Sequence, residues 1–173
     1  GGNKTTATAK GGVDSAKLRA LEAPLSSVIG FAQGQRAQNG SVQFPSYLGY
    51  IQLKDTTLIG NYLRMDFVRS KFPSNLVFMY GKPENDDPKF RNILPLYAIR
   101  TKDNGSAELE GENVSEARQD FDDKGRIAIK MSMDPIGTKI WAKMTEKNIG
   151  KPIAIVLDNT VYSAPFVNSV IPN

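Results

Sequence analysis

The fold class is decided by residues 126–165, RIAIKMSMDPIGTKIWAKMTEKNIGKPIAIVLDNTVYSAP. From residue 126 to 133, apolar and polar side chains alternate strictly, which predicts a half-buried strand. Asp134-Pro135 then supplies an N-cap and a first helical residue, and residues 148–150 end the predicted helix. One face of the strand would carry Ile127, Ile129, Met131 and Met133, and the helical stripe would consist of Ile136, Ile140, Trp141, Met144 and Ile149.

A second strand and a tight turn follow this helix. Ile153–Leu157 is a short apolar run that predicts a buried strand. Asp158-Asn159 can adopt the positive φ angles of a two-residue turn, which would return the chain as a strand over residues 161–164. The order strand, helix, strand, strand predicts an α+β fold, with a mixed or mostly antiparallel sheet packed against helices.

Upstream, the pattern is weaker. Residues 1–12, GGNKTTATAKGG, have no large apolar side chain and are interpreted as a flexible linker or an artificial remnant, and residues 13–173 are predicted to form a single domain. Three helices are predicted here, the first over residues 14–22. The second is short, starts at Pro24 and carries Leu25, Val28, Ile29 and Ala32. The third runs from the cap Asp55 to Val68, with an apolar side formed by Leu58, Ile59, Tyr62, Leu63 and Phe67. Predicted strands are 47–53, 75–80 and 93–101, and predicted loops are 34–40 and 81–89.

Composition excludes much chemistry. The 173 residues contain no His and no Cys, so a thiol nucleophile, an imidazole base, a thiolate metal site and a disulfide are all absent. The apolar runs are too short for a membrane helix. The pI of about 9.2 comes from an excess of basic residues before position 41, whereas residues 41–173 hold 17 basic and 16 acidic groups. Nucleic-acid binding is therefore not expected. Because the chain begins with Gly1, we interpret it as a piece of a longer protein.

Two groups of acidic side chains are candidate site residues. Asp120, Asp122 and Asp123 with Gly125 resemble a calcium loop, but Lys124 and Met131 stand where oxygen ligands are needed, so a charged turn is favoured. The three alternating acids Glu108, Glu110 and Glu112 are interpreted as a solvated edge or loop rather than paired catalytic carboxylates.

Neither nucleophilic catalysis nor cofactor binding is predicted. Ser115, Ser163 and Ser169 lack an activating His, and no Ser/Lys dyad pattern is present. The glycines form no phosphate-binding motif. Trp141 and the methionines around it could line an apolar ligand groove, but their periodicity favours a core. We therefore expect no enzymatic activity, no cofactor and no metal.

The C-terminal segment resembles a known family. The resemblance is carried over residues 108–173 by Glu110-Gly111, Val114–Arg118, Met131–Asp134, Gly137, Trp141, Thr145, Asn148–Lys151, Ile153–Asp158 and Val161–Pro165. These resemble the head part of the first large periplasmic domain of SecD, a protein-export membrane component often fused with SecF. A looser resemblance to the fused SecDF branch is carried upstream by Gly49-Tyr50, Lys54–Thr56 and Ile93–Ala98. The sequence departs at Asn159, where the family usually has Gly, but Asn tolerates the left-handed region.

The resemblance implies a periplasmic head domain inserted as a lobe into a larger inner-membrane protein. It implies that the chain engages unfolded preprotein during export driven by the proton-motive force, with SecF and the SecYEG translocon as partners through the parent protein. The matched residues expected to be structural are Ala117, Arg118, Gly137, Trp141, Asn148, Gly150, Asp158, Tyr162, Ser163, Ala164 and Pro165. The alternatives are a small soluble extracytoplasmic binding or adaptor domain without a role in export and, less favoured, an enzyme with carboxylate chemistry.

Overall fold

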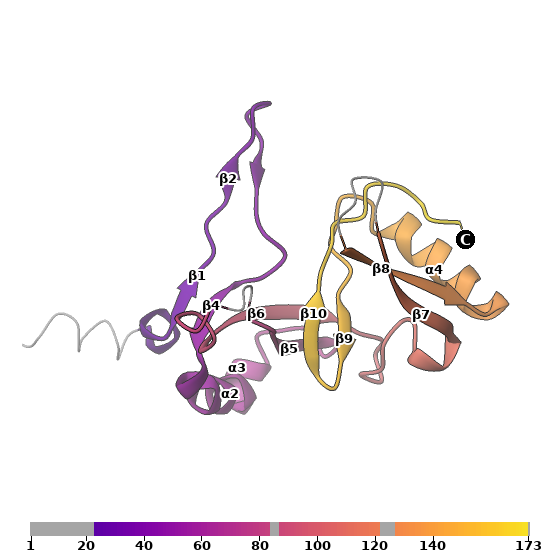
Figure 1. Ribbon diagram of the computed structural model, residues 1–173. Helices are drawn as coiled ribbons and strands as arrows, with labels where there is room; N and C mark the ends of the chain where they lie inside the picture. The colour runs from indigo at the N-terminus through magenta and orange to yellow at the C-terminus, as the bar shows by residue number, and fades with distance from the viewer. Residues whose placement is uncertain (1–22, 84–86, 122–126, 173) are drawn as a thin grey trace, which may run out of the picture.

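The structure is a computed structural model that describes residues 23–83, 87–121 and 127–172 (Figure 1). Its main element is a six-stranded sheet with strand order β1-β4-β6-β5-β10-β9. The strands are β1 (Ile29–Phe31), β4 (Gly49–Gln52), β5 (Leu76–Gly81), β6 (Ile93–Arg100), β9 (Ile155–Leu157) and β10 (Thr160–Ser163). β10 runs parallel to β5, and the other neighbouring pairs are antiparallel. This mixed sheet with its helices confirms the predicted α+β class.

Two antiparallel pairs stand apart from this sheet. The first pair forms an arm that projects from one side of the sheet in Figure 1. The second pair lies beside the longest described helix. The arm consists of β2 (Gln35–Arg36) and β3 (Val42–Gln43), and the second pair of β7 (Val114–Phe121) and β8 (Ile127–Met133) next to α4 (Pro135–Lys147). The remaining elements are α2 (Thr56–Arg64), α3 (Asp66–Arg69) and the 3-10 turns η1 (Pro24–Ser27), η2 (Leu53–Asp55) and η3 (Gly111–Asn113).

The buried core lies between α2 and the large sheet. Alternate residues of a strand face the same side, so β1, β4 and β6 each direct apolar side chains toward the helix. Ile59 and Leu63 are four residues apart on α2 and face this layer. The core cluster consists of Ile29, Ile51, Ile59, Leu63 and Leu96. Within the described residues, no helix combines the length and the apolar content needed to cross a bilayer.

A tyrosine at the margin of this core ties α2 to the sheet. The Tyr80 hydroxyl donates a hydrogen bond to the Thr56 carbonyl oxygen at 2.9 Å. Burial raises the pKa of Tyr80 above its ordinary value of 10.0, and the charge of Arg64 partly opposes the rise. Tyr80 therefore stays neutral at physiological pH and keeps its donor.

Several upstream expectations are wrong because tertiary pairing overrides local pattern. The helix predicted from Pro24 to Ala32 is only the short turn η1, since Ile29 enters β1 and pairs with Ile51. The predicted loop 34–40 contains β2. The helix predicted to Val68 is interrupted at Met65, whose ψ of 132° is not helical. Asp55 makes no side-chain capping hydrogen bond, and Leu58 and Phe67 are exposed rather than in the core.

In the C-terminal part the predicted elements are confirmed, and the predicted burial of several side chains is corrected. The predicted strand, the Asp134-Pro135 helix start and the turn at Asp158-Asn159 are confirmed, with φ angles of 49° and 58° in the turn. β9, predicted to be buried, is exposed because it lies at an edge of the sheet. Of the predicted helical stripe, Ile136 is exposed, Ile149 is exposed and lies beyond the end of α4, and Trp141 is half-buried rather than fully buried. The side chains of 127–129 are not described, so the face predicted beneath Trp141 is only partly visible. The predicted helix at 14–22 and the linker at 1–12 lie outside the described residues.

Candidate functional site

The N-terminus of α4 is fixed by a small polar network. The Asp134 carboxylate accepts hydrogen bonds from the Gly137 backbone N–H at 2.6 Å and from the Asn113 side-chain amide at 3.3 Å. The Asp134 backbone N–H also donates to the Asn113 carbonyl oxygen at 3.0 Å. These contacts join α4 to the turn before β7, and the sequence-predicted Gly137 is one of their donors.

The same contacts lower the pKa of Asp134 below its ordinary value of 3.8. The hydrogen bond from the Gly137 N–H has the larger effect, and the hydrogen bond from the Asn113 amide has the smaller one. Acidification then protonates the unfolded chain before the folded one, so stability is present above the ordinary pKa and is lost as the pH falls through the lowered one.

We therefore predict that Asp134 contributes an acid-sensitive part of the stability. Asp134→Asn keeps an N-capping oxygen but removes the titrating group. The stability advantage of the natural chain over Asp134→Asn should shrink as the pH falls from about 5 to about 2. Urea melts of both chains at each pH measure this difference. A difference that stays constant over that range would show that the carboxylate is not held in its charged form by the fold.

The C-terminal tail is tied to α4 through a buried hydroxyl. Thr145 is fully buried, and its hydroxyl donates to the Ala142 carbonyl oxygen at 3.0 Å and accepts from the Ile171 N–H at 3.1 Å. Two of the matched residues end the helix nearby: the Asn148 amide donates to the Met144 carbonyl oxygen at 2.8 Å, and Gly150 has a φ of 75°. The Gly150 N–H donates to the Val167 carbonyl oxygen at 2.8 Å. These residues hold the segment that leads into β9.

β9 forms an apolar edge on the large sheet. It is the terminal strand in the order of strands that the structure describes. Its three successive side chains are all exposed, Ile155 and Val156 by 37% and Leu157 by 56%. On the neighbouring β10, Tyr162 is 45% exposed, and the Lys82 ammonium lies 3.9 Å from the centroid of its ring. We call Ile155, Val156, Leu157 and Tyr162 the β9 edge.

The β9 edge presents backbone groups as well as side chains. Val156 stands opposite Val161 on β10, and the Val161 carbonyl oxygen accepts from the Lys82 N–H on the other side of β10. In antiparallel pairs of this kind both residues direct their N–H and C=O groups away from each other. The Val156 backbone groups therefore point to the open side of the edge, where an extended chain can pair with them.

A second apolar surface lies where the arm leaves the sheet. Residues around β1, β2, β3 and β4 line a crevice of about 560 Å³. Phe31 and Phe44 in its wall are 53% and 62% exposed. Tyr47 also lines it and packs against Tyr50 in a tilted arrangement, with 4.7 Å between ring centroids. Sequence reasoning misses this crevice, because the pattern predicts a loop at β2 and predicts no element at β3.

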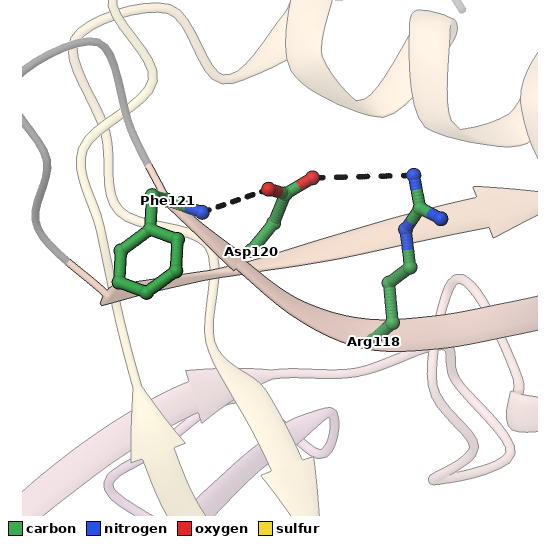
Figure 2. A network of polar contacts seen from close by, with 3 residues as sticks. All are labelled: Arg118, Asp120 and Phe121. Carbon is green, nitrogen blue, oxygen red and sulfur yellow. Dashed lines mark hydrogen bonds and ion pairs between the residues drawn. The ribbon is translucent and has the colours of Figure 1, made fainter.

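The charged groups considered from sequence are spread over β7 and the preceding turn. Figure 2 shows Asp120 between the Phe121 N–H, which donates to it at 2.9 Å, and the Arg118 guanidinium at 4.0 Å. Both side chains of this ion pair are largely exposed, so its contribution to stability is small. Asp122 and Asp123, the other members of the calcium-loop pattern, lie outside the described residues. Among the described residues, no group of three or more acidic side chains could hold a metal ion.

The remaining candidates are not brought together. Glu108 and Glu112 are exposed, and the Glu110 carboxylate accepts from the Ala107 N–H at 3.0 Å. Ser115, Ser163 and Ser169 are exposed on separate segments, and so is Ala117 on β7. Ala164 is half-buried and Pro165 is exposed, with its carbonyl oxygen accepting from the Ile153 N–H at 3.0 Å.

Comparisons with known proteins find one matching family and several relatives of this chain. The family described as SecDF, P1 head subdomain, matches residues 97–173, eleven residues further upstream than the resemblance seen in the sequence. The chain is 38% identical over 126 residues to the protein translocase subunit SecD of Rhodothermus marinus, covering 72% of this chain and 20% of that protein. It is 31% identical over 133 residues to the protein translocase subunit SecDF of Thermus thermophilus, covering 75% of this chain and 18% of that protein.

The chain thus spans about a fifth of the length of these curated relatives. A solved structure of a membrane component SecDF that enhances protein export aligns with 94% of this chain and 60% of its own, at 25% identity and a TM-score of 0.36. The assignment of residues 13–96 to the same head domain stays a prediction. Residues 97–173 of the chain match the P1 head subdomain of the SecDF family, and about three quarters of the chain is similar in sequence to SecD and SecDF protein translocase subunits.

Proposed function

We propose that this chain is an extracytoplasmic part of a protein translocase subunit and that it holds unfolded preprotein during export driven by the proton-motive force. In this proposal it works on the periplasmic side of the inner membrane, with SecF and SecYEG as partners through the rest of the parent protein. The observation that carries the proposal is the β9 edge, which combines three exposed apolar side chains with outward backbone groups.

An edge of this kind suits a substrate with no fixed sequence. Hydrogen bonds to the backbone of β9 would be available to any extended chain, whatever its side chains. The apolar side chains of β9 and Tyr162 would then bury the hydrophobic residues that an unfolded polypeptide exposes. The crevice beside the arm, with Phe31 and Phe44, offers a further place for large apolar side chains. A folded preprotein presents neither a free strand nor its core, so it should not bind.

No catalytic step is part of this proposal. The pKa of Tyr80 is raised and the pKa of Asp134 is lowered, so both shifts move titration of these two groups away from neutral pH. We therefore propose that proton coupling and any chemistry belong to other parts of the parent protein.

The β9 edge predicts a specific effect of Val156→Pro. Proline lacks the N–H that points to the open side, and an edge position tolerates it. A photo-reactive side chain at Leu157, in the intact translocase, should crosslink to a translocating preprotein. Val156→Pro should lower the crosslinking yield about two- to tenfold, the loss of one backbone hydrogen bond.

Val156→Thr is the matched control, because threonine keeps both the β-branched shape and the N–H. Its yield should stay close to that of the natural chain. The crosslink should also vanish when the preprotein is folded before export. Equal yields for Val156→Pro and Val156→Thr, or a crosslink that folded preprotein makes as well, would contradict the proposal.

A further inference from the structure

A surface on the other side of the sheet has no role in the proposed function. At the junction of α2 and α3, Phe67 is 75% exposed, the largest value among the exposed large hydrophobic side chains of the described residues. Met65 is 50% exposed and Leu58 is 45% exposed. Figure 1 shows α2 and α3 on the side of the sheet opposite the arm. We call Leu58, Met65, Phe67 and Lys71 the α2–α3 surface.

The backbone holds Phe67 outward. The sequence pattern places Phe67 on the apolar stripe of one helix that continues to Val68. In the structure the non-helical Met65, with a ψ of 132°, ends α2 and separates α3 from it. The Arg69 guanidinium donates to the carbonyl oxygens of Pro73 and Ser74 at 3.0 and 2.6 Å, which ties the turn after α3. Phe72 in this turn packs edge-on against Phe78, with 5.1 Å between ring centroids. The neighbouring turn is therefore anchored while Phe67 remains exposed.

The charge around these apolar side chains is positive. Residues 53–72 contain four basic side chains, Lys54, Arg64, Arg69 and Lys71, and two acidic ones, Asp55 and Asp66. The Lys71 ammonium lies 4.6 Å from the centroid of the Phe67 ring. An aromatic ring that projects beside a lysine fits the surface of an anionic membrane, because the ring can enter the headgroup region while the ammonium reaches lipid phosphates.

We propose that the α2–α3 surface docks on an anionic phospholipid bilayer, with Phe67 inserted and Lys71 at the phosphates. A helical surface offers no open strand edge, so an unfolded polypeptide would find no backbone partner here, in contrast to the β9 edge. The net positive charge favours anionic lipid over a second, equally charged copy of the chain. This docking would hold the sheet against the membrane with the arm directed away from it.

Vesicle flotation of this chain tests the proposal. Binding to vesicles of phosphatidylglycerol and phosphatidylethanolamine should exceed binding to pure phosphatidylcholine vesicles and should weaken with added salt. Phe67→Ser should lower the partition coefficient about tenfold, the loss of one inserted aromatic ring. Lys71→Glu should lower it several-fold on the anionic vesicles only. Phe121→Ser, which removes another largely exposed aromatic ring, 64% exposed on β7, should leave binding unchanged.

Because Phe67, Lys71 and Phe121 are all exposed, circular dichroism should show that all three variants remain folded. Equal binding to both kinds of vesicle, no binding at all, or Phe67→Ser indistinguishable from Phe121→Ser would overturn the proposal. So would a concentration-dependent dimer that Phe67→Ser abolishes, since that would assign the surface to a second copy. None of these outcomes bears on the β9 edge, so the two proposals fail separately.

Discussion

Ile59→Ala should lower the free energy of unfolding by about 2 to 5 kcal/mol, the cost of emptying a buried isoleucine site. Ile59 has no exposed surface and lies in the cluster between α2 and the sheet. Its neighbours come from separate strands, Ile51 from β4 and Leu96 from β6, so the cavity cannot close without moving the helix. A typical domain is stable by about 5 to 15 kcal/mol, so the loss is a large part of the total.

Leu58→Ala is the matched control, since it makes a similar truncation one residue earlier on the same helix. Leu58 is 45% exposed, and its substitution should change stability by only about 0.5 kcal/mol. Denaturant melts followed by circular dichroism measure both effects. If Ile59→Ala and Leu58→Ala shift the midpoint equally, the core does not lie between α2 and the sheet.

The parts of the fold that sequence predicted correctly are set by neighbours along the chain. Asp134-Pro135 starts α4 because a carboxylate and a proline favour the first turn of a helix whatever surrounds it. Asp158-Asn159 forms the turn between β9 and β10 because both residue types tolerate a positive φ. Such signals need no tertiary contact, so they can be predicted from the sequence.

The errors arise where a partner strand decides the structure. β7 was not predicted, because its successive residues 115–118 are all exposed and show no alternation, and it exists through its pairing with β8. The apolar composition of β9 predicted a strand, but only the strand order shows that it is an edge. Local sequence does not show the tertiary surroundings of a residue, and this is why sequence reasoning misses both proposed surfaces. Leu157 and Phe67 have the pattern of core residues in the sequence, but they are 56% and 75% exposed.

The second large effect is expected at Gly137, where the sign of the change is informative. A glycine inside a helix usually costs about 0.5 to 1 kcal/mol relative to alanine, so Gly→Ala should stabilise an ordinary helix. At Gly137 a Cβ would lie 2.8 Å from both the Cβ and the carbonyl oxygen of Asn113 and 3.2 Å from the Cβ of Met133. The oxygen is backbone, so it cannot rotate away. Gly137→Ala should therefore destabilise the chain by about 1 to 3 kcal/mol.

The contact that alanine would disturb is also the contact that positions α4. Displacing Asn113 would lengthen its hydrogen bond to Asp134 and the bond from the Asp134 N–H to the Asn113 carbonyl oxygen. Gly111→Ala provides the control, because a Cβ there meets no atom within 4 Å although it lies only two residues from Asn113. Thermal melts should show a lower midpoint for Gly137→Ala and little change for Gly111→Ala. A gain in stability for Gly137→Ala would mean that α4 does not press on the turn before β7, and the sequence match at Gly137 would then need another physical reason.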